Sequence, residues 1–408
     1  MLYPMKFMPL FKNKVWGGNK IKSLGFDYDP LPNCGELWAL SSVEGNESII
    51  TNGFLADNTL NEVLEIYMGE LVGERNFERF GTQFPLLIKL IDAADKLSIQ
   101  VHPDDALAQS RGMENGKTEM WYILEAEQGA QIIDGFNRPL SVEEYELYLQ
   151  NGKLEQLLHV EYPDSGDAFF IPAGRVHALG KGILLAEIQQ TSDCTYRLYD
   201  YNRPDTNGKL RELHTAEALA AIDFSELKDG KTHYTYRENA TQQLANCPYF
   251  TTNLVQLTPP DAQHPSNPTA IRKDFHDLDS FVVYFCVEGI AAVKCLEKIC
   301  PIHVGECVLV PAVADSVELF SEGPAKLLEI YIDPSTYAGM ELPHKNDFDW
   351  FAQFVGADPD DCCCDDDCDC HHDDDCDCDD CHDHDCHCED DDCHCHHDHD
   401  CHCGHHHE

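Results

Sequence analysis

The chain has 408 residues, enough for two or three domains with sizeable cores, and a formal net charge of −46. The charge is concentrated, because residues 358–408 contain 22 Asp or Glu, 14 Cys and 13 His and no Lys or Arg. The rest of the chain is moderately acidic without a basic patch, so we expect neither a nucleic-acid partner nor a membrane-surface partner. No apolar run reaches the roughly 18 residues that a membrane helix needs, and the N-terminus does not read as a signal peptide.

The first part of the chain predicts short strands with helical interruptions. Residues 1–55 are expected to form strands and turns, followed by a helix over residues 57–80 whose N-cap is Asp57 or Asn58. The Ser-x-x-Glu start of residues 141–158 predicts a capping box that opens a helix or helix pair. These segments frame the strands in which the chemistry-bearing residues lie.

A buried strand is predicted within residues 84–107, where PLLIKLIDA is almost continuously apolar. Lys89 is its exception. A lysine in such a strand either extends its ammonium group to the surface or contacts a substrate phosphate, and the sequence favours neither. A further short helix is expected over residues 212–222.

Three short motifs supply candidate metal ligands. SIQVHPDD carries Gln100 and His102, GKTEMWYIL carries Lys117 and Glu119, and GDAFFIPAGRVHAL ends in His177 after a Pro-Ala-Gly turn. Residues two apart in a strand share a face, so each pair can point at one place. Two imidazoles, a carboxylate and an open position are typical of a catalytic Zn²⁺ site, which Fe²⁺ or Mn²⁺ also accept, with Gln100 as a possible fourth ligand. The alternative is a set of unrelated polar residues with ordinary partners.

The region 275–331 reads as a weakened repeat of the first strand region. HVGECVLVPAVADSVEL matches SGDAFFIPAGRVHAL in its turn, strand and Pro-Ala pair. Pro172 is followed five residues later by His177, whereas Pro311 is followed five residues later by Ser316, which cannot replace an imidazole. The sequence therefore predicts two related barrels, of which the second holds no metal.

The tail at residues 358–408 has almost no apolar residue other than Cys. Such a composition cannot offset the entropy of ordering the chain, so disorder is expected in the absence of metal. Cys, His and Asp are also metal ligands, and the tail is expected to bind additional ions such as Zn²⁺, Ni²⁺ or Cu⁺ weakly. It is either a metal reservoir or a low-complexity expansion whose metal binding is incidental. The other seven Cys, scattered from Cys34 to Cys307 without a CxxC pair, indicate free thiols and a cytoplasmic protein.

The motifs together resemble a known family. GDAFFIPAGRVHAL resembles the second conserved box of the cupin superfamily, and QVHPDD, GKTE, PAGRVHAL and TYRLYDYNR in this order resemble type I mannose-6-phosphate isomerases in their short bacterial form. The resemblance extends from Leu2 to the mid-330s. It implies a mainly β fold with two cupin-type β-barrels (jelly rolls) and a few short helices. The expected domains are a catalytic barrel at 1–230, a second barrel at 231–340, a linker at 341–357 and the disordered tail at 358–408.

The resemblance also implies the reaction, which is the interconversion of mannose 6-phosphate and fructose 6-phosphate through an enediol with one Zn²⁺ per chain. Arg197 matches the family's active-site arginine and would stabilise the enediolate or bind phosphate. Lys117 matches a family lysine that would transfer a proton if burial lowers its pKa. Glu187 is a second candidate for the acid or base, and the choice between the two stays open. No GxGxxG unit suggests a redox cofactor.

Two other classes of function stay open. A cupin dioxygenase would use a similar ligand set, although such sites more often contain a His-x-His pair where this chain has Gln100-Val101-His102. A non-catalytic sugar-binding or metal-storage protein would depend on the tail instead. The connection at residues 134–165 is short, so the family's phosphate site is not easily transferred to this chain.

Overall fold

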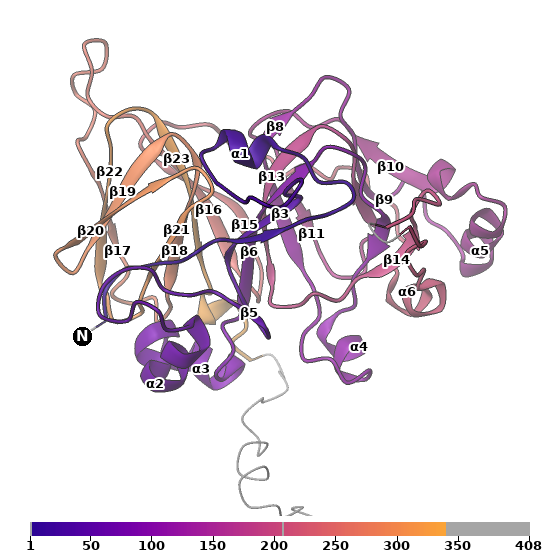
Figure 1. Cartoon of the computed structure of the whole chain (residues 1–408), viewed down its shortest axis with the longest axis horizontal. Coiled ribbons are helices and arrows are strands. Elements are labelled where there is room, and N and C mark those ends of the chain that lie inside the picture. The colour runs from indigo at the N-terminus through magenta and orange to yellow at the C-terminus, as the bar shows by residue number, and fades with distance from the viewer. Residues whose placement is uncertain (1, 206–207, 340–408) are drawn as a thin grey trace, which may run out of the picture. The chain divides into compact units, whose positions relative to one another are not determined.

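The structure is a computed structural model that describes residues 2–205 and 208–339 (Figure 1). The predicted linker at 341–357 and the tail at 358–408 lie outside the described residues. The described part forms one compact unit whose named strands all pair antiparallel in four main sheets, so the mainly β prediction is confirmed.

Two sheets face each other in the N-terminal half, and we call them the first central and first outer sheets. Their strand orders are β11-β8-β13-β6-β3-β2 and β10-β9-β12-β7-β14. The central strands are β2 (Leu10–Lys12), β3 (Glu36–Leu40), β6 (Leu86–Ala93), β8 (Glu119–Ala126), β11 (Ala168–Ile171) and β13 (Ile183–Gln190). The outer strands are β7 (Ile99–Val101), β9 (Ile132–Phe136), β10 (Leu158–Glu161), β12 (His177–Leu179) and β14 (Tyr196–Tyr199).

The second central and second outer sheets have the orders β1-β21-β18-β23-β16-β15 and β17-β22-β19-β20. The central strands are β1 (Met5–Lys6), β15 (Thr241–Asn246), β16 (Thr251–Leu257), β18 (Val282–Glu288), β21 (Cys307–Val310) and β23 (Ala325–Tyr331). The outer strands are β17 (Ile271–Asp274), β19 (Ile290–Cys295), β20 (Lys298–His303) and β22 (Ser316–Ser321). A small hairpin joins β4 (Ser42–Val43) and β5 (Asn46–Glu47). The N-terminal strand β1 therefore completes a sheet built mostly from the C-terminal half.

Among the described residues, three layers of core lie between the sheets, and a fourth cluster lies on the other face of the first outer sheet, against α5 (Val142–Gln150) and α6 (Thr215–Ala221). Alternate residues of a strand face opposite sides, and β13 shows this directly. Leu184, Ala186 and Ile188 lie in the large core shared by the two central sheets, whereas Ile183 and Leu185 lie between the first central and outer sheets. A third core fills the space between the second central and outer sheets. Each pair of sheets is thus a sandwich, and the two sandwiches pack through their central sheets.

The helices differ from the sequence-based expectation at their ends. The helix expected at 57–80 is divided into α2 (Leu60–Val72) and α3 (Glu74–Phe80) at Gly73, whose φ of +94° and backbone contact with Asp279 leave no room for a side chain. The predicted N-cap at Asp57 or Asn58 is wrong, because Thr59 forms the capping box with Glu62. Figure 1 shows both helices beside the second sandwich.

The capping box predicted for 141–158 is only half formed. Ser141 caps α5 (Val142–Gln150) by accepting from the Glu144 amide, but the Glu144 carboxylate pairs with Arg138 instead of returning to the cap. A short 3-10 turn, η1 (Leu154–Leu157), follows. The remaining helical pieces are α1 (Lys20–Ser23), α4 (Asp105–Gln109), α6 (Thr215–Ala221) and η2 (Pro334–Thr336). Residues 105–107, expected as strand, therefore begin a helix.

The two sandwiches repeat the same strand arrangement, but the alignment of β22 with β12 is shifted by one residue. Ser316 begins β22 as His177 begins β12, yet Ser316 is exposed and the neighbouring Val317 lies in the second core. The interior position equivalent to His177 is therefore Val317, which a one-residue offset in a strand explains.

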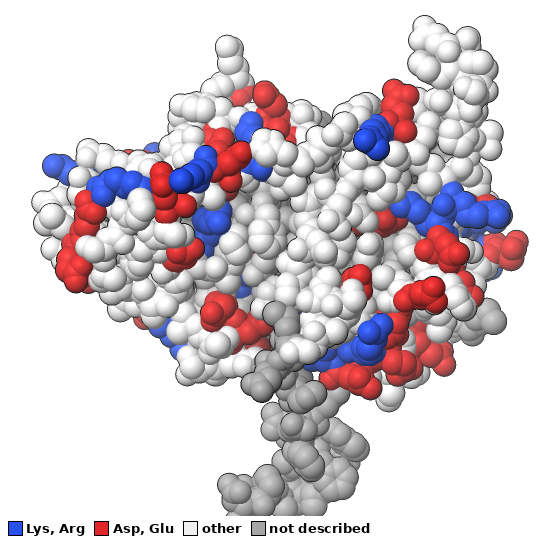
Figure 2. All heavy atoms as spheres, turned by 180° about the vertical axis from the view of Figure 1, so that it is seen from behind, with Lys and Arg blue, Asp and Glu red and all other residues white. Residues whose placement is uncertain are grey.

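Charged groups of both signs are interspersed on the face in Figure 2. The seven Cys of the described residues are all free, as predicted. Among the described helices, none is long and apolar enough to span a membrane.

Candidate metal centre

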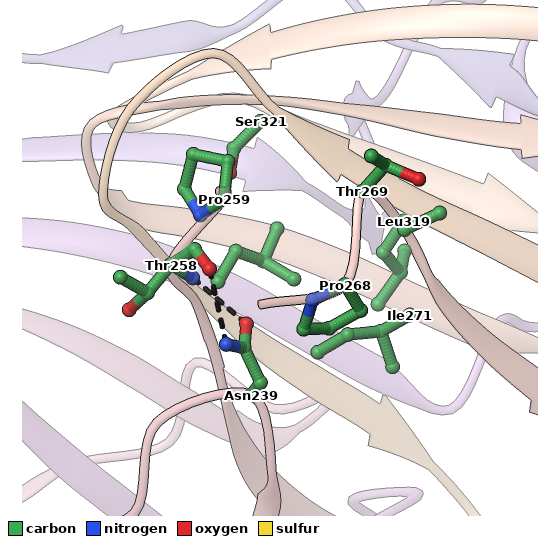
Figure 3. Close-up of a pocket in the computed structure, with 10 residues that line it drawn as sticks. Asn239, Thr258, Pro259, Pro268, Thr269, Ile271, Leu319 and Ser321 are labelled. Atoms are coloured by element: carbon green, nitrogen blue, oxygen red, sulfur yellow. Dashed lines mark hydrogen bonds between the residues drawn. The ribbon is translucent and has the colours of Figure 1, made fainter. Parts of the chain in front are cut away.

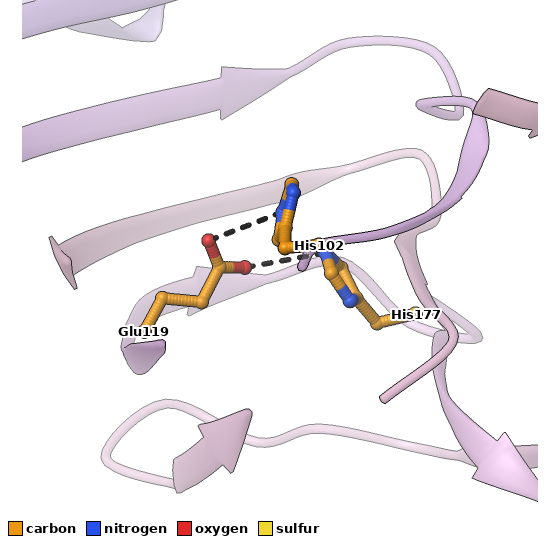
Figure 4. Close-up of side chains that lie close together, drawn as sticks. All are labelled: His102, Glu119 and His177. Carbon is orange, nitrogen blue, oxygen red and sulfur yellow. Dashed lines mark ion pairs between the residues drawn. The ribbon is translucent and has the colours of Figure 1, made fainter. Parts of the chain in front are cut away.

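Three side chains converge between the first central and first outer sheets, as the sequence predicted. His102 follows β7, Glu119 opens β8 and His177 opens β12, and their ligand atoms lie within 4.8 Å of one another. All three are buried, with exposures of 1, 0 and 1%. Figure 4 shows the Glu119 carboxylate directed at both imidazoles, 3.5 Å from His102 Nε2 and 3.3 Å from His177 Nε2. We call these residues the triad.

Backbone carbonyls fix which imidazole nitrogens carry hydrogen. The Nδ1 of His102 lies 2.8 Å from the Cys194 carbonyl, and the Nδ1 of His177 lies 2.8 Å from the Arg175 carbonyl. A carbonyl only accepts, so each Nδ1 carries the hydrogen and each Nε2 presents a lone pair toward Glu119. Burial, the largest effect, lowers the pKa of His177 to about 4 and that of His102 well below its usual range, so both rings are neutral near pH 7.

The Glu119 carboxylate lacks the hydrogen bonds that a buried acid normally has. Neither oxygen accepts a hydrogen bond of proper geometry, although Lys117 Nζ forms an ion pair with Oε2 at 2.8 Å. Burial and the nearby Glu187 raise the pKa of Glu119 to about 7, against the lowering effect of Lys117. Two lone pairs and two unsatisfied oxygens directed at one point are the donor set of a divalent cation, and they fit the metal that the sequence predicts.

Lys117 and Gln100 also lie at this centre. Lys117 Nζ is 3.3 Å from His102 Nε2, and Gln100 Nε2 is 3.2 Å from His177 Nε2. Burial lowers the pKa of Lys117, but Glu119 and Glu187 outweigh it and raise the pKa to about 12. In this arrangement the pKa of Lys117 is thus raised rather than lowered, and Lys117 is an ammonium ion here.

Glu187 lies on the same inner face of the first central sheet, on β13 between β6 and β8. It accepts from Lys89 Nζ at 3.0 Å and from Trp121 Nε1 at 3.1 Å, and register places it opposite both residues. Burial raises its pKa, but Lys89 and Lys117 reverse this and leave the pKa below its usual value. Lys89 is 6% exposed and also donates to Gln189 at 2.6 Å, so it does not extend to the surface.

Arg197 lies on β14 directly opposite Gln100 on β7, which places it on the face that carries the centre. Its Nη1 donates to the Glu212 carbonyl at 2.9 Å, and its Nε is buried without a partner. Burial lowers its pKa. Within residues 2–205 and 208–339, no ion pair or hydrogen bond joins Arg197 to the triad.

Sequence reasoning missed Asp134. It is fully buried on β9, opposite His177 on β12, and accepts from Arg175 Nη1 at 2.9 Å, while its Oδ2 has no partner. Burial raises its pKa to about 6, against the effect of Arg175. The alternation Ile132, Ile133, Asp134 was the available signal, because Ile132 faces the first sandwich's core.

Two pockets lie elsewhere. The one in Figure 3, in the second sandwich beside the Asn239–Thr258 hydrogen bonds, has about 10 Å³, room for about one water molecule. A cleft of about 470 Å³ is lined by Tyr122, residues 165–167 and 231–234, Tyr236, Gln256 and Lys326. Both lysines of this cleft already form ion pairs, Lys231 with Asp167 and Lys326 with Glu288. Neither pocket contains a triad residue.

Known proteins match the chain over nearly all of its described length. The family described as phosphomannose isomerase type I, catalytic domain, matches residues 5–132. The mannose-6-phosphate isomerase ManA of Bacillus subtilis is 35% identical over 314 residues, 76% of this chain and 93% of that protein. The mannose-6-phosphate isomerase of Streptococcus mutans is 36% identical over 260 residues, 63% of this chain and 80% of that protein.

Solved structures give the same result. A crystal structure of the mannose 6-phosphate isomerase from Bacillus subtilis has a TM-score of 0.70 and 31% identity, covering 81% of this chain and 99% of that one. A zinc-bound mannose 6-phosphate isomerase has a TM-score of 0.63 and 18% identity over 81% of this chain and all of that one, a likeness of fold.

Proposed function

The chain belongs to the family of type I mannose-6-phosphate isomerases, and from that premise we propose that it interconverts mannose 6-phosphate and fructose 6-phosphate. The observation that carries the proposal is the triad itself, in which two Nε2 lone pairs and a carboxylate that accepts no hydrogen bond meet at one buried point. A dioxygenase would use a similar ligand set, but the relatives that the chain matches are named as mannose-6-phosphate isomerases. The phosphorylated sugar is the expected small-molecule substrate.

We propose His102, Glu119 and His177 as the ligands of one metal ion per chain. Zn²⁺ is the preferred ion, because two neutral imidazoles and a carboxylate are typical protein ligands of catalytic zinc sites. Gln100 is the proposed fourth protein ligand. This requires its amide to turn, since Nε2 rather than Oε1 now lies nearer His177. A bound divalent ion would stabilise negative charge that develops on the sugar oxygens at C1 and C2.

The reaction moves a proton between C2 and C1 through an enediol, so the chain must supply a base and cations beside the sugar. Glu187 is the better candidate for the base, because Lys89 and Trp121 hold it ionised and fixed in place. Lys117, an ammonium here, is suited to donate hydrogen bonds or a proton to a sugar oxygen. Arg197 has an unpartnered Nε and is suited to bind an anionic oxygen of the enediolate or the phosphate.

The remaining finer expectations are proposals of the same kind. The two sandwiches support two cupin-type barrels, with 1–230 as the catalytic part and 231–340 as the second. Free cysteines support a cytoplasmic location. Extra metal binding by residues 358–408 stays a prediction from composition.

A coupled assay on mannose 6-phosphate, with and without chelator, tests the proposal. We expect turnover of the purified chain, loss of turnover after chelation and recovery when Zn²⁺ is returned. Unphosphorylated mannose is the control substrate for recognition of the phosphate. Turnover that persists in chain shown to be metal-free would contradict the metal centre, and absence of any turnover with several divalent ions would contradict the reaction.

A further inference from the structure

Asp134 stands beside a proposed metal ligand without touching it. On neighbouring strands β9 and β12, Asp134 and His177 are directly opposite, so their side chains lie on one face of the first outer sheet. The Asp134 side chain is 0% exposed. The chain closes over it at Gly230, where a Cβ atom would come within 2.2 Å of Asp134 Oδ2.

Arg175 connects these two residues through two different groups. Its guanidinium Nη1 donates to Asp134 Oδ1 at 2.9 Å, and its main-chain carbonyl accepts the His177 Nδ1 hydrogen at 2.8 Å. Next to it, the Gly135 amide of β9 donates to the Val176 carbonyl at 2.7 Å. Strand β9 therefore holds the turn before His177 by a side-chain pair and by a backbone bond.

The turn also reaches the other imidazole. The Gly174 amide donates to the His102 carbonyl at 2.9 Å, and Gly174 has a φ of +87°, a conformation that favours glycine. A shift of residues 172–176 would therefore move the carbonyl that orients His177 and disturb the segment that carries His102.

We propose that Asp134 is a positioning residue for the metal centre, acting through Arg175 to hold His177 in the Nδ1–H form with its Nε2 directed at the ion. The inference rests on the proposed metal site. A buried carboxylate with one unpartnered oxygen is unfavourable on its own, so its presence here needs a reason beyond packing. Partners that orient an imidazole ligand commonly change metal affinity by about 10–100-fold.

Charge gives Asp134 a second way to act on the same ion. The Arg175 guanidinium belongs to the turn that precedes His177, and it pairs with Asp134 Oδ1 at 2.9 Å. The Asp134 carboxylate offsets that cation, so a divalent ion is repelled less than it would be by an unpaired Arg175. Replacing Asp134 removes both the geometric and the electrostatic support.

The test measures zinc bound by the full-length chain by equilibrium dialysis, with free Zn²⁺ set by a chelator buffer. The His177→Ala chain, measured in parallel, gives the zinc bound by the tail and other sites, and its value is subtracted. For Asp134→Ala we expect half-saturation to move about 10–100-fold higher in free Zn²⁺. Turnover at saturating zinc should fall much less than this, because Asp134 does not touch the substrate.

Two further variants keep the result interpretable. Asp134→Asn keeps the volume and one acceptor oxygen, so it should fold even where Asp134→Ala does not, and should show a smaller shift in the same direction. Glu144→Ala breaks the Arg138–Glu144 pair, which touches no triad residue, and should leave zinc affinity unchanged. Melting of each metal-free chain separates a general loss of stability from a change in affinity.

The outcomes separate the inference from the proposal beneath it. Wild-type chain that binds no His177-dependent zinc would overturn the metal site and this inference with it. Wild-type chain that binds such zinc, with Asp134 variants of unchanged affinity, would overturn the inference alone.

Discussion

The two sandwiches share the same strand order but differ in the polar side chains that occupy their interiors. In the central sheets, β11-β8-β13-β6-β3 corresponds to β21-β18-β23-β16-β15, and in the outer sheets β10-β9-β12-β7 corresponds to β20-β19-β22-β17. A frame repeated to this extent makes each site residue comparable with a residue at the same register in the other sandwich.

One carboxylate is common to both interiors. Glu187 on β13 lies opposite Trp121 and Lys89, and Glu329 on β23 lies opposite Tyr284 and Asn253. Both acids accept from the two residues opposite them, Glu329 from Tyr284 at 2.9 Å and from Asn253 at 3.1 Å.

The proposed metal ligands of the first sandwich have no counterparts among the described residues of the second. The position of Glu119 is taken by Val282, that of His177 by Val317, and that of Gln100 by Lys273, which pairs with Glu329 at 3.0 Å. Both interiors pair their buried glutamate with a lysine, Glu187 with Lys89 and Glu329 with Lys273. Only the first interior adds two imidazoles and a second carboxylate, Glu119. The comparison indicates that the buried glutamate is part of the strand arrangement that both sandwiches share. The proposed ligands at the strand ends are what distinguishes the first sandwich.

The largest expected effect comes from a triad ligand and its counterpart. His177→Ala should lose bound metal and turnover together, by about 10⁴-fold or more, since several kcal/mol of charge stabilisation depend on the ion. Val317→Ala, at the same register, should keep both and lower the free energy of unfolding by about 2 kcal/mol through the cavity it leaves. Metal content, turnover and denaturant melts measure the pair. Full activity of metal-free His177→Ala would remove the triad from the mechanism.

The two buried acids should respond differently to the same substitution. Glu187→Gln should keep the metal and lose about 10³-fold in turnover, because the neutral amide cannot accept the proton. Glu329→Gln should keep turnover but lower the free energy of unfolding by about 3 kcal/mol, since Lys273 loses its buried partner. Equal loss of turnover in both variants would contradict a catalytic role special to Glu187.

A smaller loss is expected for Arg197, which has no counterpart ligand in the second sandwich. Arg197→Ala should keep the metal and lose about 10²-fold in turnover, as when one preorganised donor to a developing anion is removed. Arg197→Lys separates charge from the planar group and should recover only part of the rate. Metal analysis accompanies the kinetics, because loss of metal in Arg197→Ala would show that the residue supports the fold of the site instead.

The sequence predicted the candidate metal centre because the pattern that identifies it lies within short segments of the chain. Residues two apart in a strand share a face, which is sufficient to direct Gln100 with His102 and Lys117 with Glu119. The alternation in β9 could place Asp134 in the interior but not beside His177, because that neighbour depends on the pairing of β9 with β12, which are separated by about 40 residues of chain. The N-cap was misplaced at Asp57 for a similar reason, since its amide bonds to Ile50 and its φ is +71°.

The smallest expected effect tests the one-residue shift in the repeat. Motif alignment pairs Ser316 with His177, but the residue of β22 that faces the interior there is Val317. Ser316→Ala, at an exposed position, should change the free energy of unfolding by no more than about 0.5 kcal/mol. Val317→Ser, which puts a hydroxyl into the second core, should lower it by several times as much. Urea melts of the two variants decide the matter, because a shift equal for both, or larger for Ser316, would mean that Ser316 faces the interior after all.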